Sequence, residues 1–178
     1  MATTEKRAIY SGADVLQSIY FPQLFHVNET LKLSNLKGSD PNEINEYLLN
    51  RIRTKIGNKC IDIGYIDKDS ITIVSRTLGQ VNTSHFNGEV YYHIRCQANI
   101  CKPVEGTRLS VKIVDKNKIG LLAIQGPLYI YLPAVYLENA EILDTVSVGS
   151  MALIEIVNYT YQLNDTFIKV GGKFIKSI

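Results

Sequence analysis

The sequence contains little cysteine, little net charge and no long apolar run, and each absence argues against a class of protein. Its three cysteines, Cys60, Cys96 and Cys101, form no CxxC pair, and the first residues lack a signal-peptide pattern. We therefore expect an intracellular, reducing compartment and no disulfide framework. No apolar stretch approaches the roughly 18 residues of a membrane helix, so no membrane partner is expected. The net charge of +2 is too small to indicate nucleic acid by itself.

Isoleucine is abundant and alanine is scarce, with 22 and 8 residues among 178. β-Branched residues favour strands, whereas alanine is the strongest helix former, so this composition predicts a chain made mostly of strands. With 46% hydrophobic and 20% charged residues, the chain has the composition of a folded protein with a buried core.

One segment, residues 40–58, carries the signals of a helix at both ends. Asp40 is a suitable N-cap, Pro41 fits the first helical position, and Glu43 has the spacing of a capping box. Gly57-Asn58 forms a natural stop. Between these signals, apolar residues recur with helical spacing at Ile44, Leu48, Leu49, Ile52 and Ile56.

Strand patterns flank this helix. Four segments have the composition or alternation of strands: 24–33, 59–66, 69–76 and 89–102. The turn Asp67–Asp69 predicts a hairpin between the second and third of them. We interpret residues 1–20, which lack a clean period, as an N-terminal extension. Residues 21–105 are then predicted to form a domain in which one helix packs on an antiparallel sheet.

From residue 106 the pattern changes to short strands with glycine at the bends. Five segments are predicted as strands: 108–114, 120–124, 128–132, 152–157 and 166–175. Five strands in about 70 residues fit a small Greek-key barrel of the OB type, so we predict an OB-fold barrel over 106–178. Gly120 is expected to bend the chain between the first two strands, and Gly126-Pro127 to turn it into the third. The expected fold class is therefore α+β.

The segment "KPVEGTRLSVKIVDKNKIGLLAIQGPL", residues 102–128, resembles the stalk subunit of multisubunit RNA polymerases, which is the seventh subunit in eukaryotic polymerase II and has an archaeal counterpart. Matching positions are Lys102, Pro103, Gly106, Asn117, Lys118, Gly120, Gly126 and Pro127. The resemblance runs from about Leu24 to the C-terminus. It implies an N-terminal tip domain followed by a barrel of the ribosomal-S-one type. Departures such as Leu122, where the family often has an aromatic residue, suggest a divergent, viral member.

This resemblance implies a non-catalytic subunit of DNA-directed RNA polymerase, located in the host cytoplasm or virion, or in the nucleus if the source is cellular. The polymerase core subunits and nascent single-stranded RNA are its implied partners, and a stalk partner like the fourth subunit is left open. The tip loop between two glycines is the implied core contact, with candidates Leu78, Gly79, Val81, Phe86 and Gly88. Each apolar member could equally pack in a small satellite core.

The outward positions of the predicted barrel strands suggest weak RNA binding. Basic side chains beside aromatic rings are what single-strand binding requires. The candidate RNA-binding residues are Arg108, Lys112, Lys116, Lys118, Tyr129 and Tyr131. A free-standing, single-stranded RNA-binding OB-fold protein is the alternative function, and it would have to bind RNA without a polymerase.

The sequence predicts no catalytic, metal or cofactor site. His93 and Cys96 lie three residues apart on a strand and are expected on opposite faces, where they cannot act together. Asp67 and Asp69 are assigned to a turn. No P-loop, dinucleotide fingerprint or metal-ligand spacing occurs.

Overall fold

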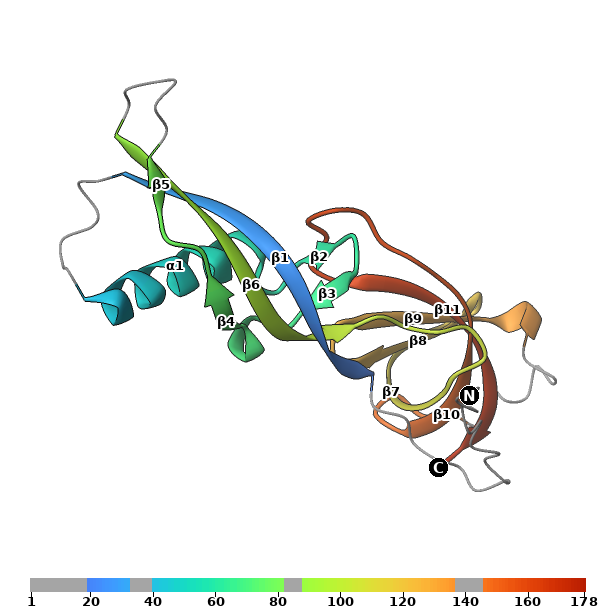
Figure 1. Ribbon diagram of the computed structural model, residues 1–178. Helices are drawn as coiled ribbons and strands as arrows, with labels where there is room; N and C mark the ends of the chain where they lie inside the picture. The colour runs from blue at the N-terminus through green and yellow to red at the C-terminus, as the bar shows by residue number, and fades with distance from the viewer. Residues whose placement is uncertain (1–18, 33–39, 82–87, 137–145) are drawn as a thin grey trace, which may run out of the picture.

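The computed structural model describes residues 19–32, 40–81, 88–136 and 146–178. They form an open antiparallel sheet with one helix, followed by a closed five-stranded barrel. Figure 1 shows the two parts end to end in an elongated molecule. The part with β1–β6 and α1 is called the sheet half below, and the part with β7–β11 is called the barrel. This architecture confirms the predicted α+β class.

The sheet half is built on two long strands. β1 (Tyr20–Lys32) and β6 (Glu89–Cys101) pair antiparallel along all their 13 residues. Along its other edge, β6 pairs with β3, β4 and β5 in succession, and β2 adds to β3. These short strands are β2 (Cys60–Ile61), β3 (Gly64–Ile66), β4 (Thr72–Arg76) and β5 (Gln80–Val81).

Helix α1 (Pro41–Ile56) covers one face of this sheet. Its start is as predicted, because the Asp40 carboxylate accepts a hydrogen bond of 2.9 Å from the Asn42 amide. The helix ends before Gly57, and Asn58 takes the left-handed conformation. Leu48 and Ile52 are fully buried against the alternate residues of β6, from Val90 to Ile100, that point to this side.

A buried carboxylate ties the helix to β1. Glu29 is 4% exposed and is the one buried charged side chain among the described residues. Its two oxygens accept from Arg51 at 3.1 Å and from Lys55 at 2.7 Å. Both partners are on α1, so one buried acid orients the helix on the sheet.

One predicted hairpin is wrong. Segment 59–66 contains its own hairpin, β2–β3, and the short 3-10 helix η2 (Lys68–Ser70) then carries the chain to β4. β3 and β4 do not pair with each other but lie one after the other along β6. The reason is that β3 pairs with β2 along one edge and with β6 along the other, so no edge is left for β4. Gly64, with φ of 134°, lets β3 approach β6, because a Cβ there would lie 2.6 Å from the Cys101 carbonyl oxygen. Only glycine permits this close approach, and strand alternation alone did not reveal it.

The first strand also starts earlier than predicted. β1 begins at Tyr20, inside the segment 1–20 that we interpreted as an extension. Ile19 and Tyr20 pack against the core of the barrel. Residues 1–18 lie outside the described part of the chain.

The barrel has the connectivity of an OB fold. Its strands close in the order β7-β8-β9-β11-β10, with β9 and β11 parallel and the other neighbours antiparallel. This is a five-stranded Greek-key barrel, as predicted. The strands are β7 (Arg108–Asn117), β8 (Gly120–Gln125), β9 (Leu128–Pro133), β10 (Met151–Thr160) and β11 (Ile168–Ser177), with the 3-10 helix η3 (Ala134–Tyr136) after β9.

Two predicted bends in the barrel depend on glycine. A Cβ at Gly120 would overlap the carbonyl oxygen of Leu132, so the turn from β7 into β8 requires a residue without a side chain. Gly126 has a φ of 58°, in the left-handed region that the tight turn before Pro127 needs.

The core of the barrel extends into the sheet half. Cys60 and Cys101 are fully buried in the same cluster as the inward residues of the barrel, and Tyr20 and Tyr65 pack at its border. Backbone hydrogen bonds also cross this junction, as the Cys60 amide donates to the Asp165 carbonyl at 2.7 Å. The two parts therefore share one packed interface.

We predict that Glu29→Gln destabilises the protein. The change leaves Arg51 and Lys55 without their buried counter-charge, which should lower the free energy of unfolding by about 1–3 kcal/mol. Urea unfolding followed by circular dichroism measures it. The exposed Glu46→Gln on the same helix is the control, with an expected change below about 0.5 kcal/mol. Equal losses in both variants would contradict this role of Glu29.

We also predict a loss of stability at alkaline pH. Burial, with a smaller effect of Cys60, raises the pKa of Cys101 from 9.0 to about 12, and burial, then Asp165, raises the pKa of Cys60 to about 11. Between pH 9 and pH 11 the unfolded chain releases protons that the folded protein keeps, so stability falls as pH rises. Urea midpoints at both pH values measure this. Cys101→Ala should show a smaller drop, and a constant wild-type midpoint would refute the prediction.

Candidate nucleic-acid interface

The outward side of β9 forms the middle of the candidate interface. Leu128, Ile130 and Leu132 are buried, so Tyr129 and Tyr131 point outward and are 42% and 37% exposed. In OB folds, the face of the second and third strands binds oligonucleotides, with the loops after the first and fourth strands beside it. β8 and β9 are the second and third strands of this barrel, so both tyrosines lie on that face.

An aromatic and basic cluster beside Tyr129 was not predicted. The rings of Tyr129 and Phe167 are 4.7 Å apart between centroids and tilted by 42°. The Lys169 ammonium lies 5.9 Å from the centroid of the Phe167 ring. Alternation around the buried Ile168 and Val170 could have shown that Phe167 and Lys169 point outward. Alternation could not have shown that these side chains lie next to Tyr129, because the parallel pairing of Lys169 with Tyr129 is a tertiary feature.

Lys112 lies in the same row of outward residues. This row crosses four neighbouring strands, and its residues pair in the order Lys112 of β7, Ile124 of β8, Tyr129 of β9 and Lys169 of β11. With about 4.8 Å between adjacent strands, this row places a cation on each side of the tyrosine. A single strand crossing the face would meet basic groups on both sides of an aromatic platform.

The turn between β7 and β8 borders the other end of the face. The Asn117 side-chain oxygen accepts from the amides of Ile119 and Gly120, both at 3.0 Å. The Tyr131 hydroxyl donates to the Ile119 carbonyl at 3.2 Å, which joins this turn to β9. Lys118 is exposed in the turn.

Lys116 and Arg108 are directed elsewhere. The Lys116 ammonium donates to the Val146 carbonyl at 3.1 Å, before β10. Arg108 lies 3.4 Å from the Glu155 carboxylate on β10. β7 pairs with β8 only from Lys112 onward, so Arg108 lies along the edge of β7 that faces away from β9. Of the six predicted RNA-binding residues, four therefore lie on or beside this face: Lys112, Lys118, Tyr129 and Tyr131.

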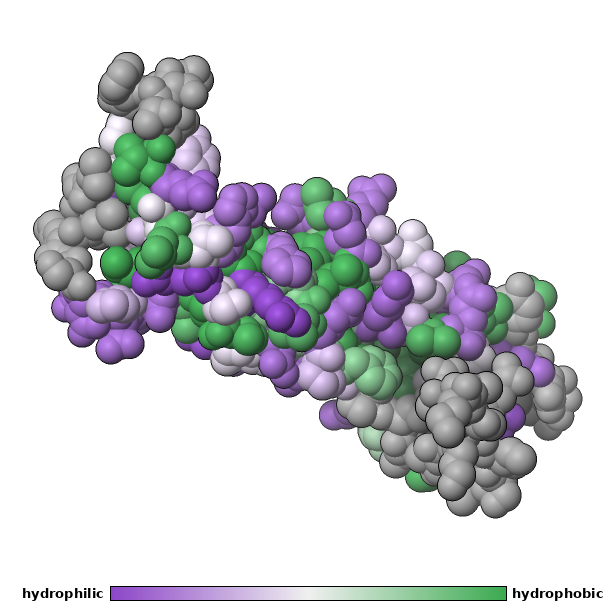
Figure 2. Space-filling view, viewed as in Figure 1, coloured by the Kyte–Doolittle hydropathy of each residue, from purple (hydrophilic) through white to green (hydrophobic). Residues whose placement is uncertain are grey.

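Of the predicted core-contact residues, Leu78 and Gly79 come just before β5 and Val81 is part of it, and β5 lies at the end of the sheet half away from the barrel (Figure 1). Leu78 is 87% exposed and Val81 is 58% exposed, and Figure 2 shows hydrophobic surface over β5. At Gly79 a Cβ would overlap the Val90 side chain, and Gly88 has a φ of 65°. The backbone geometry therefore explains why glycine occupies both positions. Phe86 lies outside the described residues.

The residues considered for catalysis lie apart, as predicted. Cys96 is buried on the face that α1 covers, while His93 is exposed on the other face, with its Nδ1 2.7 Å from the Asn28 side-chain oxygen. Among the described residues, no three His, Cys, Asp or Glu side chains come together as a metal site. In the same residues, no helix has the length and apolar character needed to cross a membrane.

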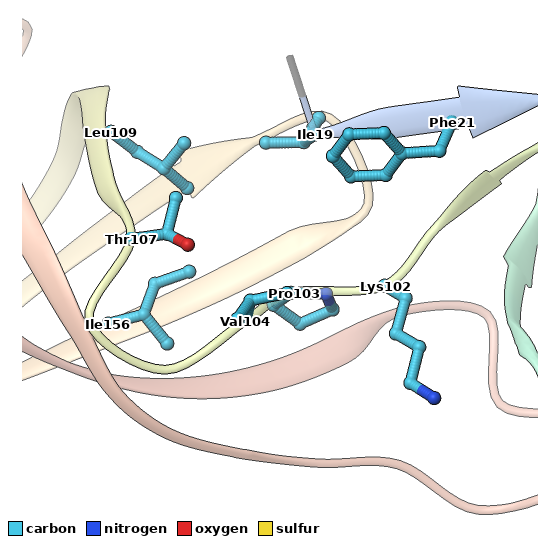
Figure 3. Close-up of a pocket in the computed structure, with 8 residues that line it drawn as sticks. All are labelled: Ile19, Phe21, Lys102, Pro103, Val104, Thr107, Leu109 and Ile156. Atoms are coloured by element: carbon cyan, nitrogen blue, oxygen red, sulfur yellow. The ribbon is translucent and has the colours of Figure 1, made fainter. Parts of the chain in front are cut away.

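A small apolar hollow lies at the junction of the two parts (Figure 3). Its volume is about 130 Å³, and Pro103, Leu109 and Ile156 are among the residues that line it. Phe21 and Val104 also line it and are 52% and 58% exposed. The junction therefore leaves two large apolar side chains in contact with solvent.

The fold defines a protein with an OB barrel joined to a helix-and-sheet half. Over 171 residues the chain is 23% identical to a protein of Acanthamoeba polyphaga mimivirus. That viral protein is provisionally named as a subunit of a DNA-directed RNA polymerase. The alignment covers 89% of this chain and 83% of the viral protein, so it includes parts of both halves. No protein-family model matches the chain.

A solved structure gives a much weaker likeness. The solution structure of GSP13 from Bacillus subtilis matches 40% of this chain and 55% of its own, with 12% identity and a TM-score of 0.35. A likeness of this size supports no conclusion, so the assignment of the barrel depends on its strand order and pairing.

We predict that Tyr129→Ala weakens binding of single-stranded RNA. Loss of one stacked base costs about 1–3 kcal/mol, so the Kd should rise roughly 5- to 150-fold. Fluorescence anisotropy with a labelled oligouridine at fixed salt measures this. Arg108→Gln, on the side of the barrel away from β9, is the control and should change the Kd less than about twofold. Equal effects of the two variants would place the interface elsewhere.

Proposed function

We propose that the chain is a non-catalytic stalk subunit of a multisubunit DNA-directed RNA polymerase. The observation that carries this proposal is the similarity to the mimivirus polymerase protein, because it extends over most of both chains rather than over the barrel alone. An OB barrel by itself occurs in many unrelated proteins. An alignment that extends into the helix-and-sheet half as well favours a function in transcription.

In this proposal the sheet half docks on the polymerase core. Leu78 and Val81 support this role, since large apolar side chains left exposed close together on a surface can mark a contact with another protein. Val81 is part of β5 and Leu78 comes just before it, and β5 lies at the end of the molecule opposite the barrel (Figure 1). Docking there would leave the barrel projecting from the polymerase.

The barrel would then contact nascent RNA as it leaves the polymerase. Tyr129 and Phe167 offer stacking surfaces that accept any base, and Lys112 and Lys169 offer charge to the phosphates. Such contacts do not read sequence. With few cations and a chain net charge of +2, binding should be weak and sensitive to salt.

The junction hollow supports a stalk partner like the fourth polymerase subunit. Its volume of about 130 Å³ is enough for roughly one aliphatic side chain, and Phe21 and Val104 would be covered by the same partner. The relative is viral, which favours a large DNA virus as the source and the host cytoplasm or virion as the location.

We expect the protein to purify with the large polymerase subunits in a fixed ratio. Tagged protein from infected cells or virions, analysed by quantitative mass spectrometry, tests this. Recovery at background level in an active polymerase preparation would count against the proposal.

A double substitution, Leu78→Asp with Val81→Asp, should release the protein from the polymerase without unfolding it. Charged groups on these exposed side chains would oppose burial in a partner groove. Val148→Asp is the control, because Val148 is 60% exposed but lies in the barrel half. Retention of the double variant, judged by co-purification, would exclude this docking surface.

The alternative is a free-standing RNA-binding protein, which the cluster of Tyr129, Phe167 and Lys169 favours. Such a protein would bind RNA alone with micromolar or tighter affinity at physiological salt. Charge reversal of Lys112 and Lys118 should then abolish binding. Absence from polymerase preparations combined with this affinity would select the alternative.

A further inference from the structure

The β2–β3 hairpin of the sheet half holds the loop between β10 and β11, residues 161–167. The Cys60 amide donates to the Asp165 carbonyl at 2.7 Å, and the Asn164 amide donates to the Cys60 carbonyl at 2.8 Å. The Cys60 thiol lies 3.8 Å from the Phe167 carbonyl. The Tyr161 hydroxyl donates to the Asp62 carbonyl at 3.4 Å. The hairpin therefore contacts this loop at four positions along its length.

The same loop carries one ring of the candidate interface. The Phe167 carbonyl faces the Cys60 thiol, while the Phe167 ring packs on Tyr129. After it, the Ile168 amide donates to the Pro127 carbonyl at 2.9 Å. Phe167 is thus held between the sheet half on one side and the turn into β9 on the other.

The barrel holds the two ends of the loop, because Tyr161 stacks on Tyr159 and packs at the border of the barrel core, and Phe167 packs on Tyr129. The middle of the loop is different. It turns through Asn164, which has a φ of 69°, and the Asp165 carboxylate accepts from the Gln162 amide at 2.8 Å. These bonds shape the turn but do not attach it to the barrel. The backbone hydrogen bonds that join Asn164 and Asp165 to a distant part of the chain go to Cys60. The sheet half therefore holds the middle of the loop, at Asn164 and Asp165.

In OB folds, the loop between the fourth and fifth strands borders the nucleic-acid face. We propose that the β2–β3 hairpin is a positioning element for this face, with Cys60 and Asp62 as its positioning residues. The inference rests on the proposed contact between barrel and RNA. RNA binding on the barrel and packing of the hairpin against the loop are then coupled, and by linkage each strengthens the other.

Two buried thiols provide the test. Cys60 and Cys96 are both fully buried in the sheet half, but Cys60 contacts the loop, whereas Cys96 belongs to the separate core beneath α1. In the full chain, Cys60→Ala keeps the two backbone hydrogen bonds to the loop but removes the thiol next to the Phe167 carbonyl, and it should raise the Kd for a labelled oligouridine about threefold or more. Cys96→Ala should leave the Kd within about twofold, although it also loses a buried group. Tyr161→Phe, which removes only the hydroxyl, should change the Kd in the same direction as Cys60→Ala.

A second measurement separates positioning from general stability. Saturating oligouridine should slow hydrogen exchange of the Cys60 and Asn164 amides about fivefold or more. The Ile44 amide, which bonds within the start of α1, should exchange as before. Unchanged exchange at Cys60 and Asn164 in the RNA-bound protein would overturn the coupling.

The outcomes also distinguish this inference from the proposed function. If the wild type binds oligouridine but its Cys60 and Asn164 amides exchange at an unchanged rate, the coupling is wrong and the RNA contact stands. Equal binding by the Cys60 and Cys96 variants would exclude the Cys60 thiol from the positioning contact. If the wild type does not bind oligouridine, the RNA contact proposed for the barrel is wrong, and the coupling is wrong with it.

Discussion

The interface between the two parts depends on apolar burial at the junction. β6 ends with Cys101 inside the core of the barrel, and Cys60 of the neighbouring hairpin is buried in the same cluster. Because a packed core transmits displacement rather than absorbing it, the sheet half and the barrel are held in one arrangement. The long pairing of β1 with β6 then carries that arrangement to the far end of the sheet.

This arrangement separates two kinds of surface along one elongated molecule. Apolar side chains are exposed near β5 at one end, while tyrosines, Phe167 and lysines gather on the barrel. Apolar anchors suit a lasting contact with a protein, whereas rings and scattered cations suit a strand that slides past. The separation is what the proposed stalk role would require, with docking at one end and RNA contact at the other.

Local patterns predicted much of this architecture. The caps at Asp40 and Gly57, the alternation of β9, and the glycines at 120 and 126 are signals that neighbouring residues carry, and the structure confirms each of them. Errors arose where the determining contact was distant. The hairpin at residues 67–69 was wrong because pairing with β2 and with the distant β6 occupies both edges of β3. Phe167 was missed because parallel pairing of β9 with β11 brings it to Tyr129.

The sequence by itself determined the fold class, the helix, the order of the five barrel strands and which side of β7 and β9 faces the core, because these depend on periodicity and on the steric limits of single residues. Only the tertiary structure decided which outward residues become neighbours. In the tertiary structure Arg108 pairs with Glu155, and Lys112 lies in the same row as Tyr129. The β10–β11 loop is hydrogen-bonded to Cys60. The physical reason is that strand register and barrel closure join residues far apart in the chain, and no local pattern encodes those pairs.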